Sequence, residues 1–189
     1  MRKATGCWQR ILTTEVICPM LTEDILTPRL RIRSYTKADR DFVLALWGDE
    51  ENGYYMIDPT RAHQDERYLA AVDEMADERS GYSLVAELRE NGLPVGTCCA
   101  FPEGDNYDIG YCIHKVHWRE GLGTEMVSAL IDWIRARGGR SVTGEVADEN
   151  AASVALVRKL GFASDRKTRY KKWGEERYFD AHYYKLELR

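Results

Sequence analysis

A strand, a short loop with two glycines and an amphipathic helix follow one another in the second half of the chain, and this unit constrains the fold more than any other feature. Residues 107–113 are rich in aromatic and β-branched side chains, which is typical of a strand. Residues 125–137 carry apolar side chains at helical spacing and end at a pair of glycines. Gly121 and Gly123 lie in between, so the backbone N–H groups of the first helical turn are open to an anion. We interpret this loop as a diphosphate cradle, with a simple tight turn as the alternative.

Two common phosphate-binding loops do not match this stretch. A dinucleotide fingerprint requires a third glycine at the position of Met126. A P-loop requires Gly-Lys-Ser/Thr, whereas Gly123 is followed by Thr124 and Glu125. A second motif is therefore needed to choose between the cradle and the turn.

The composition indicates one globular domain and excludes several classes of function. A chain of 189 residues with 44% hydrophobic and 31% charged side chains is long enough for one substantial core. The net charge of −4 argues against nucleic-acid binding, because proteins of that class are normally basic. No apolar run approaches the roughly 20 residues needed to cross a bilayer. The sequence therefore predicts no nucleic-acid partner and no membrane span.

The N-terminal region and the cysteines carry little functional signal. We expect residues 1–25 to form a loosely ordered N-terminal extension without a signal peptide, with Met20 as an alternative start. Residues 26–189 are expected to form the single folded domain. The cysteines are odd in number and lack the spacing of metal ligands, which favours a reducing cytoplasm with neither disulfides nor a metal site. They are Cys7, Cys18, Cys98, Cys99 and Cys112.

Hydrophobic periodicity predicts a mixed α/β (α+β) domain with the element order βααβββαβαββ. Strands are expected at residues 28–33, 82–89, 94–101, 107–113, 141–146, 163–173 and 177–188. Helices are expected at residues 36–47, 63–75, 125–137 and 151–160. Between the first two helices, Tyr54, Tyr55 and Met56 either pack against the helices or line a substrate pocket. The basic and aromatic residues 166–173 are predicted to form a solvated hairpin face.

A second motif begins at Asn150 and ends at Gly161-Phe162. Taken alone it is a capped helix, because Asn150 is a good N-cap and Gly161 suits a left-handed helix end. It follows the glycine loop by one helix and one strand. The combination of W/R/Q-x-x-G-x-G/A with N-x-x-S-x-x-x-x-x-K-L-G-F resembles the GCN5-related N-acetyltransferase superfamily over residues 27–188. The resemblance implies a mixed, mostly antiparallel central sheet flanked by about four helices.

Within that superfamily the chain is most similar to the ribosomal-protein N-terminal acetyltransferase branch. The similarity is carried by Thr27-Pro28-Arg29-Leu30, Ile109-Gly110-Tyr111-Cys112-Ile113-His114, Trp118 at the first loop position, and Asn150 with Ser153. It implies acetyl transfer from acetyl-coenzyme A to a primary amine. That amine is either a protein N-terminal α-amine or a small molecule.

The resemblance also implies which residues hold acetyl-coenzyme A. The amides of the glycine loop would bind the diphosphate, and the edge of the preceding strand would pair with the pantetheine amides as an added strand does. Asn150 would bond to the pantetheine arm, with Ser153 near the thioester sulfur. The implied set is Tyr111, Ile113, Trp118, Arg119, Glu120, Gly121, Leu122, Gly123, Thr124, Asn150 and Ser153.

The expected catalytic residues depart from the wider superfamily at one position. Many members carry a general-acid tyrosine four residues before the motif's glycine, where this chain has Val157. We predict Ser153 as the substitute, because a hydroxyl can protonate a thiolate or donate to an oxyanion. A plain helix residue is the alternative. Asp108 is the first candidate for the general base and Glu145 the second, with a purely structural carboxylate as the alternative for each.

Direct transfer without a metal is expected, because no cysteine lies in a motif suited to a covalent acyl-enzyme. Two other functions stay open. One is a non-catalytic acyl-coenzyme A-binding module that regulates a partner. The other is an antibiotic or polyamine N-acetyltransferase, which uses the same chemistry on a different acceptor. A homodimer is a further option.

Overall fold

The computed structural model describes residues 20–77 and 80–189. Most of the expected N-terminal extension, with Cys7 and Cys18, therefore lies outside the described residues. The strands are β1 (Ile25–Leu26), β2 (Leu30–Ser34), β3 (Tyr82–Leu88), β4 (Pro94–Glu103), β5 (Asn106–Ile113), β6 (Ser141–Ala147), β7 (Ala163–Lys171) and β8 (Tyr178–Glu187). The α-helices are α1 (Arg40–Gly48), α2 (Glu66–Glu74), α3 (Leu122–Ala136) and α4 (Ala151–Lys159).

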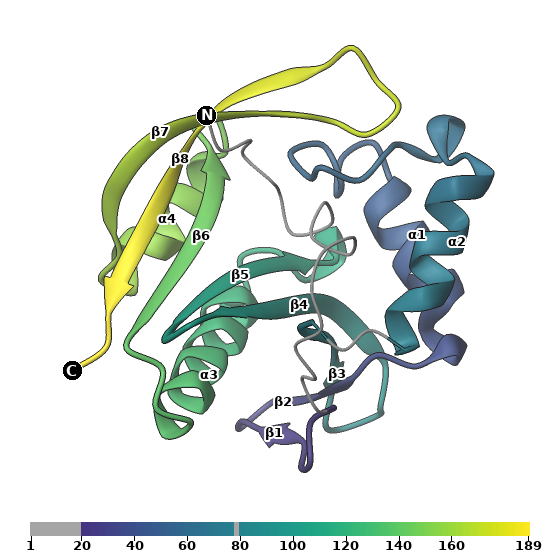
Figure 1. Ribbon diagram of the computed structural model, residues 1–189. Coiled ribbons are helices and arrows are strands. Elements are labelled where there is room, and N and C mark those ends of the chain that lie inside the picture. The colour runs from purple at the N-terminus through teal and green to yellow at the C-terminus, as the bar shows by residue number, and fades with distance from the viewer. Residues whose placement is uncertain (1–19, 78–79) are drawn as a thin grey trace.

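One sheet holds the described strands together, in the order β1-β2-β3-β4-β5-β6-β8-β7. Neighbouring strands are antiparallel except β5 and β6, which are parallel. This mixed sheet with four helices confirms the predicted fold class. The parallel pairing spans only Asn106–Asp108 of β5 and Ser141–Thr143 of β6, and beyond it the two strands run apart (Figure 1). The sheet is therefore split at its centre.

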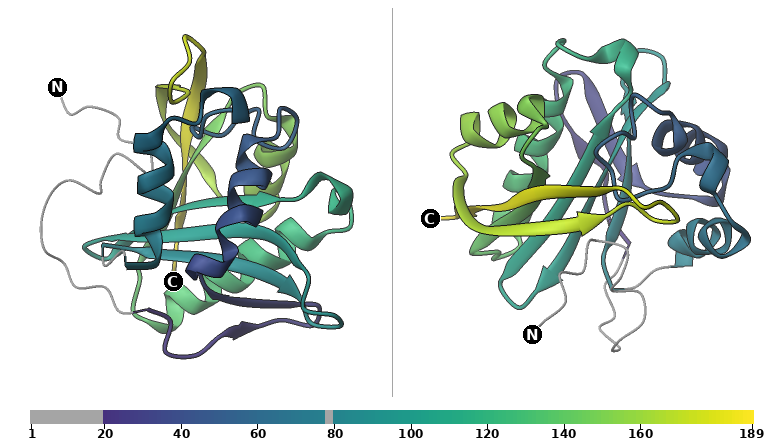
Figure 2. Two further views of the ribbon diagram at one scale, coloured as in Figure 1. Left: turned by 90° about the vertical axis from the view of Figure 1, so that its right-hand side faces the viewer. Right: turned by 90° about the horizontal axis from the view of Figure 1, so that it is seen from above.

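The helices cover the two faces of the sheet in pairs (Figure 2). Helices α3 and α4 pack on one face, where Met126 and Leu130 join Ile109 and Ile113 in the larger core. Helices α1 and α2 pack on the other face in a smaller core that includes Cys112. Successive residues of a strand point to opposite faces. Residues 109, 111 and 113 of β5 thus face α3 and α4, whereas residues 108, 110 and 112 face α1 and α2.

Capping explains where two predicted helices begin later than expected. The carboxylate of Asp39 accepts hydrogen bonds from the backbone N–H and the hydroxyl of Thr36, so a short 3₁₀ turn precedes α1. Asp65 accepts from the N–H of Tyr68 at 2.7 Å and starts α2 at Glu66. Both caps satisfy N–H groups that an uncapped helix end leaves open.

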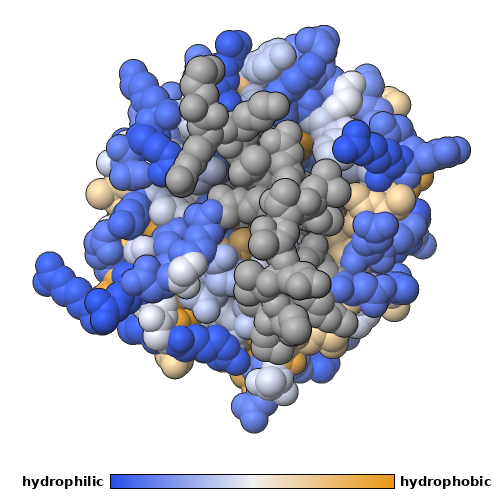
Figure 3. All heavy atoms as spheres, in the orientation of Figure 1, coloured by the Kyte–Doolittle hydropathy of each residue, from blue (hydrophilic) through white to orange (hydrophobic). Residues whose placement is uncertain are grey.

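On the face drawn in Figure 3 the described side chains are mostly hydrophilic, with scattered apolar ones. Among residues 20–77 and 80–189, no helix is both long and apolar enough to span a bilayer.

The prediction of a solvated face at residues 166–173 is wrong for Lys172, because this side chain is fully buried.

Candidate active site

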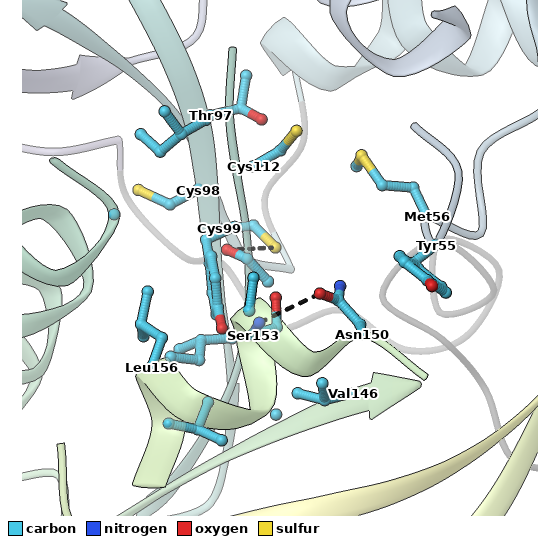
Figure 4. Close-up of a pocket in the computed structure, with 18 of the residues that line it drawn as sticks. Tyr55, Met56, Thr97, Cys98, Cys99, Cys112, Val146, Asn150, Ser153 and Leu156 are labelled. Atoms are coloured by element: carbon cyan, nitrogen blue, oxygen red, sulfur yellow. Dashed lines mark hydrogen bonds between the residues drawn. The ribbon is translucent and has the colours of Figure 1, made fainter. Parts of the chain in front are cut away.

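A cavity of about 790 Å³ occupies the split between β5 and β6. Its walls come from both faces of the sheet, because α4 contributes Ser153 and Leu156 while the α1–α2 connection contributes Tyr55 and Met56 (Figure 4). At one end the cavity reaches the glycine loop at Gly121. The split therefore forms a passage that connects the two faces.

The glycine loop has the backbone of an anion site. Arg119 and Gly121 have φ angles of 66° and 82°, and α3 begins directly afterwards at Leu122. A Cβ on Gly123 would lie 3.2 Å from Leu156 Cδ1, so a side chain there would crowd the cavity. Left-handed residues beside a helix N-terminus turn successive N–H groups toward one point, where the helix dipole favours an anion. The predicted cradle fits a diphosphate.

Glu125 anchors this loop to the N-terminal motif. Its carboxylate accepts hydrogen bonds from Thr27 Oγ1 at 2.6 Å, from the N–H of Arg29 at 2.9 Å and from Arg29 Nε at 2.7 Å. Arg29 Nη1 also donates to the carbonyl of Glu120 at 2.9 Å. Burial alone would raise the pKa of Glu125, but the bonds from Thr27 and Arg29 outweigh it and lower that pKa. Thr27 and Arg29 thus support the loop, a role that the sequence did not reveal.

The free edge of β5 fits the predicted pantetheine contact. His114 N–H donates to the Val95 carbonyl of β4, so the backbone groups of Tyr111 and Ile113 alternate to the side away from β4. The Ile113 carbonyl already accepts from Trp118 Nε1 at 2.7 Å and from Asn52 Nδ2 at 3.0 Å. The N–H of Ile113 and the backbone of Tyr111 are left to face the split. Asn52, which no sequence motif indicated, supports this edge.

Asn150 and Ser153 face the cavity from the start of α4. Asn150 Oδ1 accepts from the Ser153 N–H at 3.1 Å, which confirms the predicted N-cap (Figure 4). The cap uses the oxygen of the carboxamide, and its NH₂ group is available to a ligand. Val157, at the position of the usual tyrosine, is buried in the core.

Tyr111 adds a second hydroxyl beside Ser153. Its Oη is enclosed and, among the described residues, makes no well-formed hydrogen bond. The Ser153 hydroxyl lies next to it. Burial raises the pKa of Tyr111, and the nearby serine offsets part of that rise. The phenol is therefore neutral at neutral pH.

The two predicted carboxylates lie on the opposite side of the split, on the face of α1 and α2. Asp108 is buried and accepts from Thr143 Oγ1 at 3.2 Å. Glu145 lines the same cavity, and its Oε1 is buried without a hydrogen-bond partner among the described residues. Burial raises the pKa of Glu145, against the opposing effects of Thr168 and Arg166. A carboxylate with a free oxygen and a raised pKa suits proton transfer.

An aromatic segment lines the cavity on this side. Tyr55 Oη donates to the Glu149 carbonyl at 3.2 Å, and Tyr170 Oη donates to the Tyr55 carbonyl at 2.5 Å. The sequence allowed Tyr55 and Met56 either to pack against the helices or to line a pocket, and in the structure both line the cavity. The segment thus joins the turn before α4 to the β7–β8 hairpin.

Lys172 anchors the aromatic segment through the segment's backbone carbonyls. Its Nζ donates to the carbonyls of Gly53 at 2.7 Å and Met56 at 2.9 Å, and the residue is 0% exposed. Asp58, also buried, accepts from Tyr68 Oη at 2.9 Å. Burial lowers the pKa of Lys172, whereas it raises the pKa of Asp58 to about 6. A buried cation with two carbonyl partners fixes the shape of the segment.

The cavity therefore offers an anion cradle and an open strand edge at one end, a hydroxyl pair in the middle, and carboxylates with aromatic rings at the other end. Among the described residues no group of three or more histidine, cysteine, aspartate or glutamate side chains has the arrangement of a metal site. Such a site can bind an extended phosphorylated ligand through its backbone. It can also hold an amine between carboxylates and aromatic rings.

Comparison with known sequences agrees with this geometry. A family model described as "Acetyltransferase (GNAT) domain" matches residues 29–163. The uncharacterized N-acetyltransferase p20 of Bacillus licheniformis is 26% identical over 170 residues, which cover 87% of this chain and 96% of that protein.

Comparison with solved structures shows the same fold. Spermidine N-acetyltransferase from Vibrio cholerae, in complex with CoA and spermine, has a TM-score of 0.70 at 16% identity and covers 85% of this chain and 96% of its own. Ribosomal-protein-alanine N-acetyltransferase from Brucella melitensis has a TM-score of 0.60 at 24% identity, with 83% and 99% covered. At these identities the likeness concerns the fold.

Proposed function

Because the chain belongs to the acetyltransferase (GNAT) family, and is thus an N-acetyltransferase with acetyl-coenzyme A as donor, we propose that it acetylates a small primary amine. The observation that carries this proposal is the cavity through the split sheet. Hydroxyl groups on the face of α4 and carboxylates on the face of α1 and α2 line this same cavity. Direct transfer needs both kinds of group around one acetyl carbon.

The donor end is assigned to the residues that fit it. The amides of residues 119–124 would hold the diphosphate, the edge of β5 at Tyr111 and Ile113 would pair with the pantetheine, and Asn150 would donate its NH₂ group. When bound, acetyl-coenzyme A supplies a thioester carbonyl as electrophile and a thiol as leaving group. Ser153 would hold the proton that the leaving group needs.

Glu145 is our first choice for the general base. Its free carboxylate oxygen can accept a proton from the amine, and the raised pKa brings it nearer to the working pH. Asp108 is the second choice, since Thr143 already donates to it. An α-amine with a pKa of about 8 is roughly one-tenth neutral at pH 7, so such an acceptor needs little help from a base.

The acceptor end favours a small amine over a protein N-terminus. Tyr55 lines this end of the cavity and is tied to Glu149 across it, and Lys172 keeps the segment in that position, which narrows the room for an acceptor. Thr27 and Arg29 belong to one of the motifs that indicated the ribosomal-protein branch, and in the structure both bond to Glu125 and support the donor loop. The V. cholerae relative of this fold in complex with spermine is compatible with a cationic acceptor. A protein N-terminal α-amine is the second candidate.

An acceptor screen tests the proposal. Thiol release from acetyl-coenzyme A is measured with polyamines, amino-acid amides, aminoglycosides and peptides with free N-termini. We expect turnover with small amines, a loss of about 100-fold in kcat for Ser153→Ala, and loss of the acidic limb of the pH profile for Glu145→Gln. Glu187→Gln, at an exposed position of β8, is the control. Turnover with peptides alone contradicts the small-amine assignment, and coenzyme binding without turnover of any amine favours the regulatory module.

A further inference from the structure

Asn52 connects the α1–α2 segment with the open edge of β5. It is buried and lines the cavity. Its Nδ2 donates to the Ile113 carbonyl at 3.0 Å and to Cys112 Sγ at 3.2 Å, and its Oδ1 accepts from the Lys115 N–H at 2.6 Å. The catalytic scheme so far gives this side chain no role. Because its whole carboxamide is committed to the end of β5, Asn52 is part of that strand's edge.

The two backbone groups that Asn52 bonds point to the side of β5 away from β4. The His114 N–H donates to β4, and backbone groups alternate along a strand, so those of Ile113 and Lys115 point into the split. An added strand would pair with such a carbonyl and N–H. Asn52 occupies both, and Trp118 Nε1 takes the other lone pair of the Ile113 carbonyl. The open part of the edge therefore ends at the Ile113 N–H.

The other limit of the open edge is the pairing of β5 with β6, which stops at Asp108. Between these limits, in the described part of the chain, the edge offers the Ile113 N–H and the backbone groups of Tyr111. A Cβ on Gly123 would lie 3.6 Å from Ile113 Cγ1, so the glycine loop is next to the Ile113 end. An arm that leaves a diphosphate in that loop reaches Ile113 first. Asn52 thus marks the point at which the arm would join the edge.

From this geometry we propose that Asn52 is a positioning residue that sets where the arm of acetyl-coenzyme A joins the edge of β5, an inference that rests on the proposed acetyl transfer. The covalent length of the arm is fixed, so this point decides where the thioester lies relative to Ser153. Without Asn52, the Ile113 carbonyl and the Lys115 N–H would offer a second way to pair, displaced by up to two residues, or about 6.6 Å. An arm bound in that way would fall short of Ser153.

The loop that carries Asn52 has a second connection to the end of β5. The Asn52 N–H donates to Asp49 Oδ1 at 2.8 Å, and the Asp49 carboxylate pairs with Lys115 Nζ at 2.9 Å. On the other side of Asn52, the Gly53 carbonyl is held by Lys172. The ion pair and the carboxamide both fasten the loop, but only the carboxamide covers the strand edge. The ion pair therefore supplies a matched control.

Asn52→Ala should open the edge and leave the groups assigned to the donor in place. We expect kcat to fall about tenfold while KM for acetyl-coenzyme A stays level or falls, because an arm that binds in two ways, only one of them reactive, loses turnover without losing affinity. Asp49→Asn breaks the ion pair and keeps an oxygen for the Asn52 N–H, so its kcat should stay within about twofold of the wild type. Equal losses in both variants, or a raised KM with unchanged kcat in Asn52→Ala, would overturn the proposal.

Asn52→Asp separates the two halves of the bridge, and it also serves if Asn52→Ala does not fold. The carboxylate still accepts from the Lys115 N–H but has no proton for the Ile113 carbonyl. We expect kcat to fall, because that carbonyl is no longer covered. A kcat equal to that of the wild type would contradict the proposal.

Amide hydrogen exchange tests the edge without turnover. In the wild type the Lys115 amide should be protected without ligand, and saturating coenzyme A should protect Ile113 without changing Lys115. In Asn52→Ala the free protein should exchange the Lys115 amide about tenfold faster, and coenzyme A should restore part of its protection. No protection of Ile113 in the wild type, or none regained at Lys115 in the variant, would overturn the proposal. If no amine supports thiol release, the proposed function fails, while this measurement still decides the role of Asn52.

Discussion

The donor end and the acceptor end of the cavity are built in different ways. The donor end consists of local motifs: the glycine loop before α3, the edge of β5 and the cap of α4 all lie between residues 106 and 153. The acceptor end depends on contacts between distant segments, such as Lys172 with Gly53, 119 residues apart, and Tyr170 with Tyr55, 115 apart. The donor end is built from backbone groups, so many side-chain substitutions would leave it intact. The second is a side-chain site that a single substitution can dismantle.

The largest expected effect comes from Lys172→Met. It leaves the carbonyls of Gly53 and Met56 without their cation and removes the electrostatic attraction between Lys172 and the buried Asp58, which should cost about 3–5 kcal/mol of unfolding free energy. We expect KM for the amine to rise while the Kd for coenzyme A stays within about twofold. Urea unfolding and calorimetric titration measure the two quantities. Lys171→Met, at the neighbouring residue that pairs with Glu176, is the control. An equal loss of coenzyme binding would show that the two ends are not separate.

Asp58→Asn tests the same end through pH. The pKa of Asp58 is about 6 in the folded protein and 3.8 ordinarily, so between these values the folded state binds more protons than the unfolded state. This contribution makes the wild type lose stability as pH rises from about 4 to 6. In the variant that term is absent, so the unfolding free energy should fall less over this window, by roughly 1–3 kcal/mol. Parallel stability curves for the two proteins from pH 4 to 7 would contradict the assignment.

Gly121→Val probes the donor end. Its φ of 82° strains a branched side chain, and the displaced N–H groups should weaken coenzyme A binding about 100-fold. Gly138 has the same φ at the other end of α3, with open space around it. Gly138→Val therefore imposes equal backbone strain away from the cavity, and its coenzyme affinity should stay near that of the wild type. Comparable losses in both variants would mean that strain, and not the cradle, is responsible.

The smallest effect is expected from Glu125→Ala. It releases Thr27 and Arg29 from the first turn of α3, and the loosened loop should raise KM for acetyl-coenzyme A about tenfold without changing KM for the amine. Asp132→Ala removes an exposed carboxylate from the same helix and serves as the control. If only KM for the amine changed, Glu125 would support the acceptor end, and its assignment to the donor end would be wrong.

The same contrast explains what the sequence could predict. The glycine loop, the Asn150 cap and the strand–helix order follow from short-range spacing, and the structure has each of them. Lys172 looked like one of several solvated cations, because its burial depends on a segment more than a hundred residues away. Asn52 and Tyr170 were missed because their partners are also distant, 61 and 115 residues away, and the two-residue strand β1 is too short to give a periodic pattern. Contacts between residues that are distant in the sequence do not produce a local periodic pattern.

The short pairing of β5 with β6 has a consequence for the stability of the ligand-free protein. Two adjacent strands stop pairing after three residues, so the proposed coenzyme arm, lying between them, would complete part of the sheet's ladder. Under the proposed function the folded state would be coupled to ligand supply by mass action, and a concentration about 100 times Kd would add roughly 2.7 kcal/mol. Starvation for the coenzyme would thus loosen the centre of the sheet first, and amide exchange along residues 109–113 would report it.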